Sequence, residues 1–218
     1  CKPVILHQKK LTSNTLSKMR LLKEINRQNV DFSSITGVIS SDTNLVHKLL
    51  TYINSAGIGL TNHVSNLKQA TVLLGVSGVR RWVTLVSLQT FSEDKPPEIF
   101  TLSLLRAKFC ELIASELKRP DVTADTGFLI GMFSLLDVLL SLPMEEVLKE
   151  VALASDLNDA LLGKDNDLRR ILDLVVAYEQ GDWDKVLVCC EREQYPIEQL
   201  KPNYDAVLEW YTLLQSVN

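Results

Sequence analysis

Residues 127–137 read Gly127-Phe128-Leu129-Ile130-Gly131-Met132-Phe133-Ser134-Leu135-Leu136-Asp137. The apolar stretch continues to Leu142 and stops at Pro143, which is short of the roughly 20 apolar residues that span a bilayer. We therefore expect one helix buried in the core of the protein. Asp137 is the one acidic residue in this stretch, and a buried charge without a partner is costly. Asp137 is expected to pair with an arginine, for which Arg106 is the candidate, or to accept a hydrogen bond from the backbone or a hydroxyl. Metal ligation is the less favoured alternative.

The charge of the chain argues against two classes of binding partner. The 218 residues include 23 basic and 27 acidic side chains, which gives a formal net charge of -4 without a long run of either sign. Such a chain is not expected to bind nucleic acid or anionic lipid through bulk electrostatic attraction. No basic segment followed by an apolar segment stands near the N-terminus, so no secretory leader is predicted.

The cysteines indicate the redox environment of the protein, and the first residue indicates whether the chain is part of a longer one. The chain has four cysteines, Cys1, Cys110, Cys189 and Cys190. Their spacing is not that of a zinc site or of a disulfide framework. A reduced, cytoplasmic protein is the simpler interpretation. The chain begins at Cys1 without Met, which indicates a fragment of a longer protein. Residues 1–12 are expected to form a linker from an upstream domain.

Helical periodicity recurs along the chain, whereas the alternation typical of strands does not. Apolar residues fall at helical spacing within 46–53, 79–86 and 168–175. The pair Pro96-Pro97 forbids a continuous helix across it. These patterns predict an all-α fold, an irregular multi-helix bundle of about ten helices. The expected domain covers residues 13–218, with helical halves at about 13–95 and 96–218.

Local breakers predict where several helices begin or end. Gly75 and Gly78 separate two apolar segments, and Pro143 suits the start of a helix. The segment 178–183, with Gly181 before Asp182, resembles the turn of a tetratricopeptide repeat. No second copy stands about 34 residues away on either side, so a solitary helical hairpin is predicted.

A search for chemistry finds few candidates. The three histidines are His7, His47 and His63, and none stands beside an aspartate or shares one helix face with another histidine. His47 is expected to lie on the surface. Cys110 follows Phe109 on the apolar side of a helix, where a thiol usually packs rather than reacts. No catalytic, cofactor-binding or metal-binding residue is therefore assigned.

The segment Arg80-Arg81-Trp82 pairs two cations with an indole and supports two interpretations. The cluster could bind phosphate or stack on a base, because guanidinium groups offer paired donors. The favoured alternative places Trp82 in an apolar stripe and leaves the arginines in water or paired with acids. Together with the turn at Asn54 and Ser55, these residues are the predicted interaction surface, although Asn54 and Ser55 could instead cap helices.

Several motifs resemble the HDOD domain, the HD-related output domain of bacterial signalling proteins, over about residues 16–183. In the first half they are Ile39-Ser40-Ser41-Asp42, residues 48–56, Leu67-Lys68-Gln69-Ala70, Leu73-Leu74-Gly75 and Arg81-Trp82. In the second half they are residues 106–111, 127–137, 143–146 and 177–183. The second set is similar to the subgroup in which an HDOD domain follows an EAL domain.

This resemblance implies a fold derived from HD-type phosphohydrolases, whose metal site, where retained, uses His and Asp. Ser134 and Leu135 stand where His-Asp would be expected, so Ser134, Leu135 and Asp137 mark a degenerate former metal site. The expected function is a non-catalytic regulatory and protein-interaction module in cyclic di-GMP signalling. Its expected partners are the upstream EAL domain of the same chain, other signalling proteins or a second copy, with no membrane and no nucleic acid. The alternative is a divergent metal-dependent phosphohydrolase acting on a nucleotide.

Overall fold

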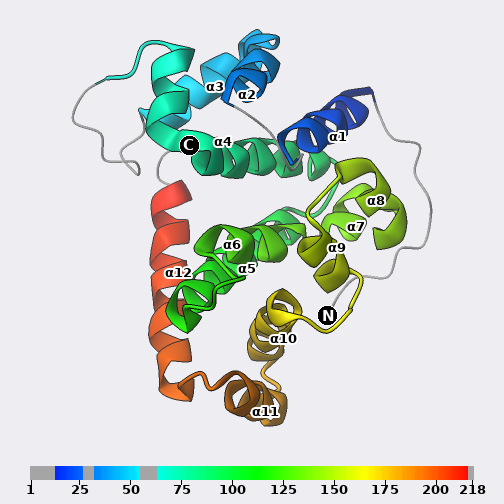
Figure 1. Ribbon diagram of the computed structural model, residues 1–218, viewed down its shortest axis with the longest axis vertical. Coiled ribbons are helices and arrows are strands. Elements are labelled where there is room, and N and C mark those ends of the chain that lie inside the picture. The colour runs from blue at the N-terminus through cyan, green and yellow to red at the C-terminus, as the bar shows by residue number, and fades with distance from the viewer. Residues whose placement is uncertain (1–12, 27–31, 55–62, 216–218) are drawn as a thin grey trace.

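The structure is a computed structural model, in which residues 13–26, 32–54 and 63–215 are described. These residues form twelve α-helices and one short 3-10 helix and contain no strand (Figure 1). The prediction of an all-α, irregular helical bundle is therefore confirmed. The helices are α1 (Ser13–Ile25), α2 (Phe32–Ser40), α3 (Thr43–Ile53), α4 (Leu67–Phe91), α5 (Pro97–Leu117), α6 (Ala124–Phe133), α7 (Leu136–Leu140), α8 (Met144–Val151), α9 (Ser155–Leu161), α10 (Asp167–Gln180), α11 (Trp183–Glu193), η1 (Ile197–Gln199) and α12 (Leu200–Gln215).

Two long helices organise the bundle. α4 contacts α1, α2 and α3, and it also contacts α6 and α7 (Figure 1). α5 contacts α6, α10 and α12, and α12 runs along one side of the molecule. One hydrophobic cluster contains residues from both predicted halves. The joint at Pro96-Pro97 lies between α4 and α5 as expected, whereas the division of the chain into two halves stays a prediction.

α4 carries the predicted apolar stripe and a predicted break. Val79, Trp82 and Val83 are buried, as the helical spacing indicated. Gly75 interrupts the helix with φ 65° and ψ 178°, a conformation that is open almost only to glycine. The breaker at Gly75 is therefore a kink within one long helix and not a gap between two separate helices.

By length and composition alone, α4 is the one helix in the described part of the chain that could cross a membrane. The core helix of a globular protein passes the same test. α4 is kinked at Gly75, carries Arg80 and Arg81, and packs against five other helices. These features fit a helix in the interior of the bundle.

Replacing Gly75 by alanine should lower the free energy of unfolding by about 1–3 kcal/mol, because a Cβ makes this backbone conformation strained. No other atom would obstruct the added Cβ, so the cost comes from the backbone alone. Thermal unfolding of the variant measures it. Gly37→Ala in α2 is the control, because Gly37 has neither a positive φ nor a crowded Cβ position. Equal melting temperatures for the Gly75 variant and the parent would contradict the prediction.

α5 and α6 cross at unusually short range because two glycines of α6 face α5. A Cβ at Gly127 would lie 2.6 Å from the Cβ of Ala114, and one at Gly131 would lie 2.5 Å from the carbonyl oxygen of Arg106. Ala107 lies under Gly131 at a similar distance. The missing side chains let the two backbones touch, which fixes the register of α6 against Arg106.

The expected single helix over 127–142 is wrong, because the structure breaks it. α6 ends at Phe133, and α7 begins at Leu136. The Ser134 hydroxyl donates to the Gly131 carbonyl at 2.6 Å, and Leu135 leaves helical geometry with φ -119° and ψ 16°. A serine hydroxyl that bonds back to the preceding turn competes with the helical ladder. The break turns Ser134 toward α5.

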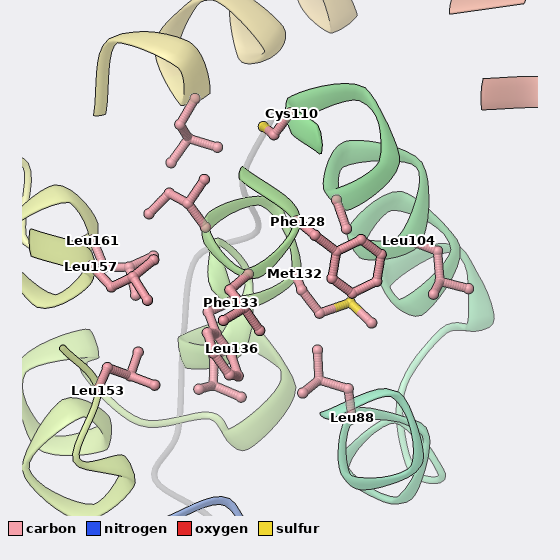
Figure 2. Close-up of a cluster of buried hydrophobic side chains, with 14 of the residues drawn as sticks. Leu88, Leu104, Cys110, Phe128, Met132, Phe133, Leu136, Leu153, Leu157 and Leu161 are labelled. Atoms are coloured by element: carbon pink, nitrogen blue, oxygen red, sulfur yellow. The ribbon is translucent and has the colours of Figure 1, made fainter. Parts of the chain in front are cut away.

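The prediction that this stretch is buried is confirmed. Every residue of α6 from Gly127 onward, and all of α7, is buried. Figure 2 shows the apolar side chains spreading to both sides of α6. Phe128 and Met132 point toward Leu88 and Leu104, whereas Phe133 and Leu136 lie on the side of α9, with Leu153, Leu157 and Leu161.

The predicted solitary hairpin is present as α10 and α11. Gly181 ends α10 with φ 67°, and the Asp182 side chain accepts a hydrogen bond from the backbone N–H of Lys185 at 3.2 Å. Tyr178 packs edge-on against Phe109 of α5, with ring centroids 5.3 Å apart. Tyr204 of α12 joins the same ring cluster. Aromatic contacts therefore attach α10 and α12 to α5.

Cys110, Cys189 and Cys190 are free thiols, and all three are buried. Burial raises the pKa of the Cys110 thiol, because the apolar surroundings disfavour the thiolate. Cys110 should therefore resist iodoacetamide at pH 8 in the native protein and react after unfolding in denaturant. Mass spectrometry of the peptide that contains Cys110 measures this. Rapid native labelling would contradict the packing role predicted from the sequence.

Candidate functional site

Three elements bring polar side chains together beside the break between α6 and α7. Arg106 lies on α5, Ser134 lies in the break, and Glu179 lies in the last turn of α10. The close crossing of α5 and α6 places the break next to Arg106. The aromatic contacts of α10 with α5 place Glu179 on the opposite side of the guanidinium.

The guanidinium of Arg106 is held from two sides. Its Nε lies 3.1 Å from both carboxylate oxygens of Glu179, and its Nη2 lies 2.6 Å from Oε2. Its Nη1 donates to the Ser134 hydroxyl oxygen at 2.9 Å. The Arg106 side chain is 9% exposed and the Glu179 side chain 13%. A bidentate pair in so little water is stable only while both members are present.

The carboxylate that binds Arg106 through both oxygens belongs to Glu179, and the pairing of Arg106 with Asp137 stays a prediction. Asp137 is buried as expected, in the first turn of α7, with 8% of its surface exposed. Glu179 lies 73 positions after Arg106. The sequence gives no local signal for a pair at that distance, apart from the resemblance of both segments to one family.

A cavity of about 260 Å³ opens beside this pair. Arg106, Ser134 and Glu179 form part of its wall, and one face of α10 forms the rest together with Leu102 of α5. The residues of α10 that line it are Arg169, Leu172, Val176, Glu179 and Gln180. The cavity wall therefore combines guanidinium groups with aliphatic side chains.

Two of the three residues of the predicted former metal site, Ser134 and Leu135, do not fit a divalent cation. Ser134 uses its hydroxyl toward Gly131 and Arg106, and Leu135 has no ligand atom. The positive guanidinium next to Ser134 would repel a metal ion there. Within 13–26, 32–54 and 63–215, no three His, Cys, Asp or Glu side chains are grouped so that they could hold a metal. His47 and His63 are exposed, and His7 lies outside the described residues.

The residues of the predicted interaction surface are mostly internal. Trp82 is 2% exposed, as the favoured interpretation expected. Arg81 donates to Glu111 of α5 at 2.6 Å and lies 2.5 Å from Asp125 of α6, and its guanidinium lies over the ring of Phe128. The opposing carboxylates keep the pKa of Arg81 raised, although burial by itself would lower it. Arg81 therefore ties three helices together.

Arg80 and Asn54 also hold the chain to itself. Arg80 donates to the carbonyl of Ile25 at the end of α1 at 3.2 Å. The Asn54 side chain exchanges hydrogen bonds with the backbone of Val64 in both directions, each at 2.8 Å. Ser55 lies outside the described residues. The interaction surface itself stays a prediction, and the structure brings only Arg81 and Trp82 close to the α5–α6 core.

Comparison with protein families shows to which family the chain belongs. A family model described as the HDOD domain matches residues 13–162. The chain belongs to the HDOD family. The resemblance inferred from the sequence motifs is therefore confirmed. Ser134 and Arg106 fall within the HDOD match, whereas Glu179 follows it.

Two curated proteins are similar to nearly the whole HDOD chain. It is 34% identical over 212 residues to the uncharacterized protein YuxH of Bacillus subtilis (strain 168), which covers 95% of this chain and 51% of YuxH. It is 31% identical over 209 residues to the cyclic di-GMP phosphodiesterase CdgJ of Vibrio cholerae serotype O1, which covers 96% of this chain and 48% of CdgJ. The HDOD chain thus spans about half the length of these relatives.

One solved structure has a similar fold. It is a crystal structure from Shewanella amazonensis SB2B that carries the provisional name metal-dependent phosphohydrolase. The TM-score is 0.56 at 14% sequence identity, over 94% of the HDOD chain and 93% of that chain. At this identity the similarity establishes the fold alone, and it agrees with the expected derivation of the HDOD fold.

Proposed function

We propose that this HDOD chain is a non-catalytic regulatory and protein-interaction module of a cyclic di-GMP signalling protein. The observation that carries the proposal is the arrangement of Arg106, Ser134 and Glu179. A guanidinium stands where the resemblance implies a metal ion, and a carboxylate holds it there through two oxygens. We propose that this guanidinium supplies the positive charge that an HD-type enzyme takes from its metal.

The similarity to CdgJ supports the signalling context. CdgJ is named a cyclic di-GMP phosphodiesterase, and this chain matches 48% of it. We propose that the named activity belongs to the half of CdgJ that this chain does not match. The proposed partner is accordingly an adjoining EAL domain of the same protein, with other signalling proteins or a second copy as further partners, in the cytoplasm.

Metal content and turnover test the proposal. The purified chain is exposed to manganese, iron and zinc, desalted, and analysed by plasma mass spectrometry, and the same samples are assayed with cyclic di-GMP. We expect metal well below one ion per chain and no hydrolysis above the buffer rate. A stoichiometric metal ion that Asp137→Ala removes, together with turnover, would overturn the proposal.

The burial of Asp137 three residues after Ser134 favours one second candidate, a divergent metal-dependent phosphohydrolase acting on a nucleotide. In that case Asp137 would be a metal ligand and its loss would abolish both metal binding and turnover. Arg106→Met distinguishes the two functions further. The second candidate requires that this variant retain or gain metal, whereas the regulatory module would remain free of it.

A further inference from the structure

We propose that the cavity beside Ser134 binds a small molecule that carries one oxyanion, a carboxylate or a phosphate group, between the guanidinium groups of Arg106 and Arg169. This inference goes beyond the proposed function, because a regulatory module needs no such ligand. It rests on the donors that line the cavity, on its apolar wall and on its size.

Arg106 has hydrogen-bonding capacity left over. A guanidinium has five N–H groups, and the bonds to Glu179 and Ser134 use the Nε–H, one N–H of Nη2 and one N–H of Nη1. One N–H on each terminal nitrogen is not used by these bonds. Two adjacent N–H groups of one guanidinium match the two oxygens of a carboxylate or phosphate. The side chain is nine-tenths buried and forms part of the cavity wall.

Arg169 supplies a second guanidinium from the far end of the same face of α10. Its Nη2 lies 3.0 Å from Asp173, and its Nη1 donates weakly to the carbonyl of Ala160 at 3.4 Å. The side chain is one third exposed, at 33%, so it can follow a ligand into the cavity. Glu179 and Asp173 balance the charges of the two arginines. A bound oxyanion would therefore depend on the N–H donors of the two guanidinium groups and not on an excess of positive charge.

The remaining wall indicates the body and size of the ligand. Leu102, Leu172 and Val176 add an aliphatic surface to the cavity wall. The volume of about 260 Å³ lies just below the roughly 300 Å³ at which pockets for drug-sized ligands begin. A cyclic dinucleotide, with two bases and two riboses, is too large for this space. The ligand is expected to be a compact acid with a short apolar portion.

A titration with two simple anions tests the site. Nitrogen-labelled protein is titrated with sodium phosphate and, separately, with sodium acetate, at an ionic strength held constant with sodium chloride. The arginine Nε–H signals are followed by NMR. We expect saturable shifts of the Arg106 and Arg169 signals with at least one anion, and the anion with the lower Kd identifies the oxyanion. Shifts that grow linearly without saturation for both anions would overturn the proposal.

Three variants separate the cavity from general surface charge. Arg169→Met should raise the Kd for the anion about tenfold, the usual effect of losing a charge-assisted hydrogen bond. Arg170→Met is the matched control on the neighbouring position, because Arg170 pairs with the exposed Asp165 and does not line the cavity. Val176→Phe should fill the cavity and abolish saturation while leaving both arginines in place. The proposal would be overturned if the parent, Arg169→Met and Val176→Phe bound the anion with equal affinity. It would also be overturned if Arg170→Met lost as much anion affinity as Arg169→Met.

Discussion

Glu179→Leu should lower the free energy of unfolding by about 3–5 kcal/mol, because it leaves the guanidinium of Arg106 buried without its carboxylate. Arg106 keeps its hydrogen bond to Ser134 in that variant but loses both carboxylate oxygens of Glu179. Thermal unfolding should show a decrease of roughly 10 °C in the melting temperature for a chain of this length. Chemical denaturation at fixed pH measures the free energy directly.

A double-mutant cycle shows whether the loss comes from the pair. Arg106→Met/Glu179→Leu should recover most of the stability, because two apolar side chains of similar volume replace a buried ion pair at little net cost. Arg170→Met, which breaks an exposed pair with Asp165, should cost no more than about 1 kcal/mol. If the double variant is as unstable as the single variants combined, the two side chains do not act as a pair.

Gly131→Ala should destabilise the protein by about 3 kcal/mol, at the upper end of what overpacking costs. The added Cβ would meet the carbonyl oxygen of Arg106 at 2.5 Å and the Cα of Ala107 at 2.6 Å. Both contacts are with backbone, so no side chain can rotate away, and α6 would have to move off α5. Thermal and chemical unfolding measure the change.

Gly37→Ala is the control for the Gly131 variant. Gly37 lies inside α2, and nothing stands within 4 Å of its Cβ position. Alanine is preferred over glycine in a helix by about 1 kcal/mol, so Gly37→Ala should be neutral or stabilising. A similar loss in both variants would mean that helix propensity, and not the α5–α6 contact, governs the result.

Much of the fold could be predicted because the sequence signals of a helix lie within the helix itself and at its ends. The spacing of apolar residues located the buried faces of α4 and α10, and the pair Gly181-Asp182 located the turn before α11. The break at Ser134 could not be predicted in this way. Residues 127–142 are apolar all round, so periodicity carries no information there, and the break depends on a hydroxyl that bonds to a neighbouring turn and to Arg106.

The candidate site was predictable only in part. Family resemblance marked Ser134 as a position without a metal ligand, and the structure places it on the cavity wall. The bond of Arg106 to Glu179 was missed, because Asp137 was conspicuous as the one acid in an apolar stretch and Glu179 comes from a distant helix. Arg81 and Trp82 suggested a binding surface because they are neighbours in sequence. Arg81 pairs with Glu111 of α5 and Asp125 of α6, and Trp82 is buried in the apolar cluster, so both contribute to packing, whereas the interaction surface stays a prediction.

The attachment of α10 and α12 to α5 has a consequence for how the molecule unfolds. The HDOD match ends at residue 162, yet Arg106 and Phe109 inside it depend on Glu179, Tyr178 and Tyr204 beyond it. The family match and the packed unit of the structure therefore have different boundaries. The C-terminal helices should melt in the same transition as the HDOD helices, and a protein shortened to the family match would expose a charge and an aromatic face that the intact chain keeps from water.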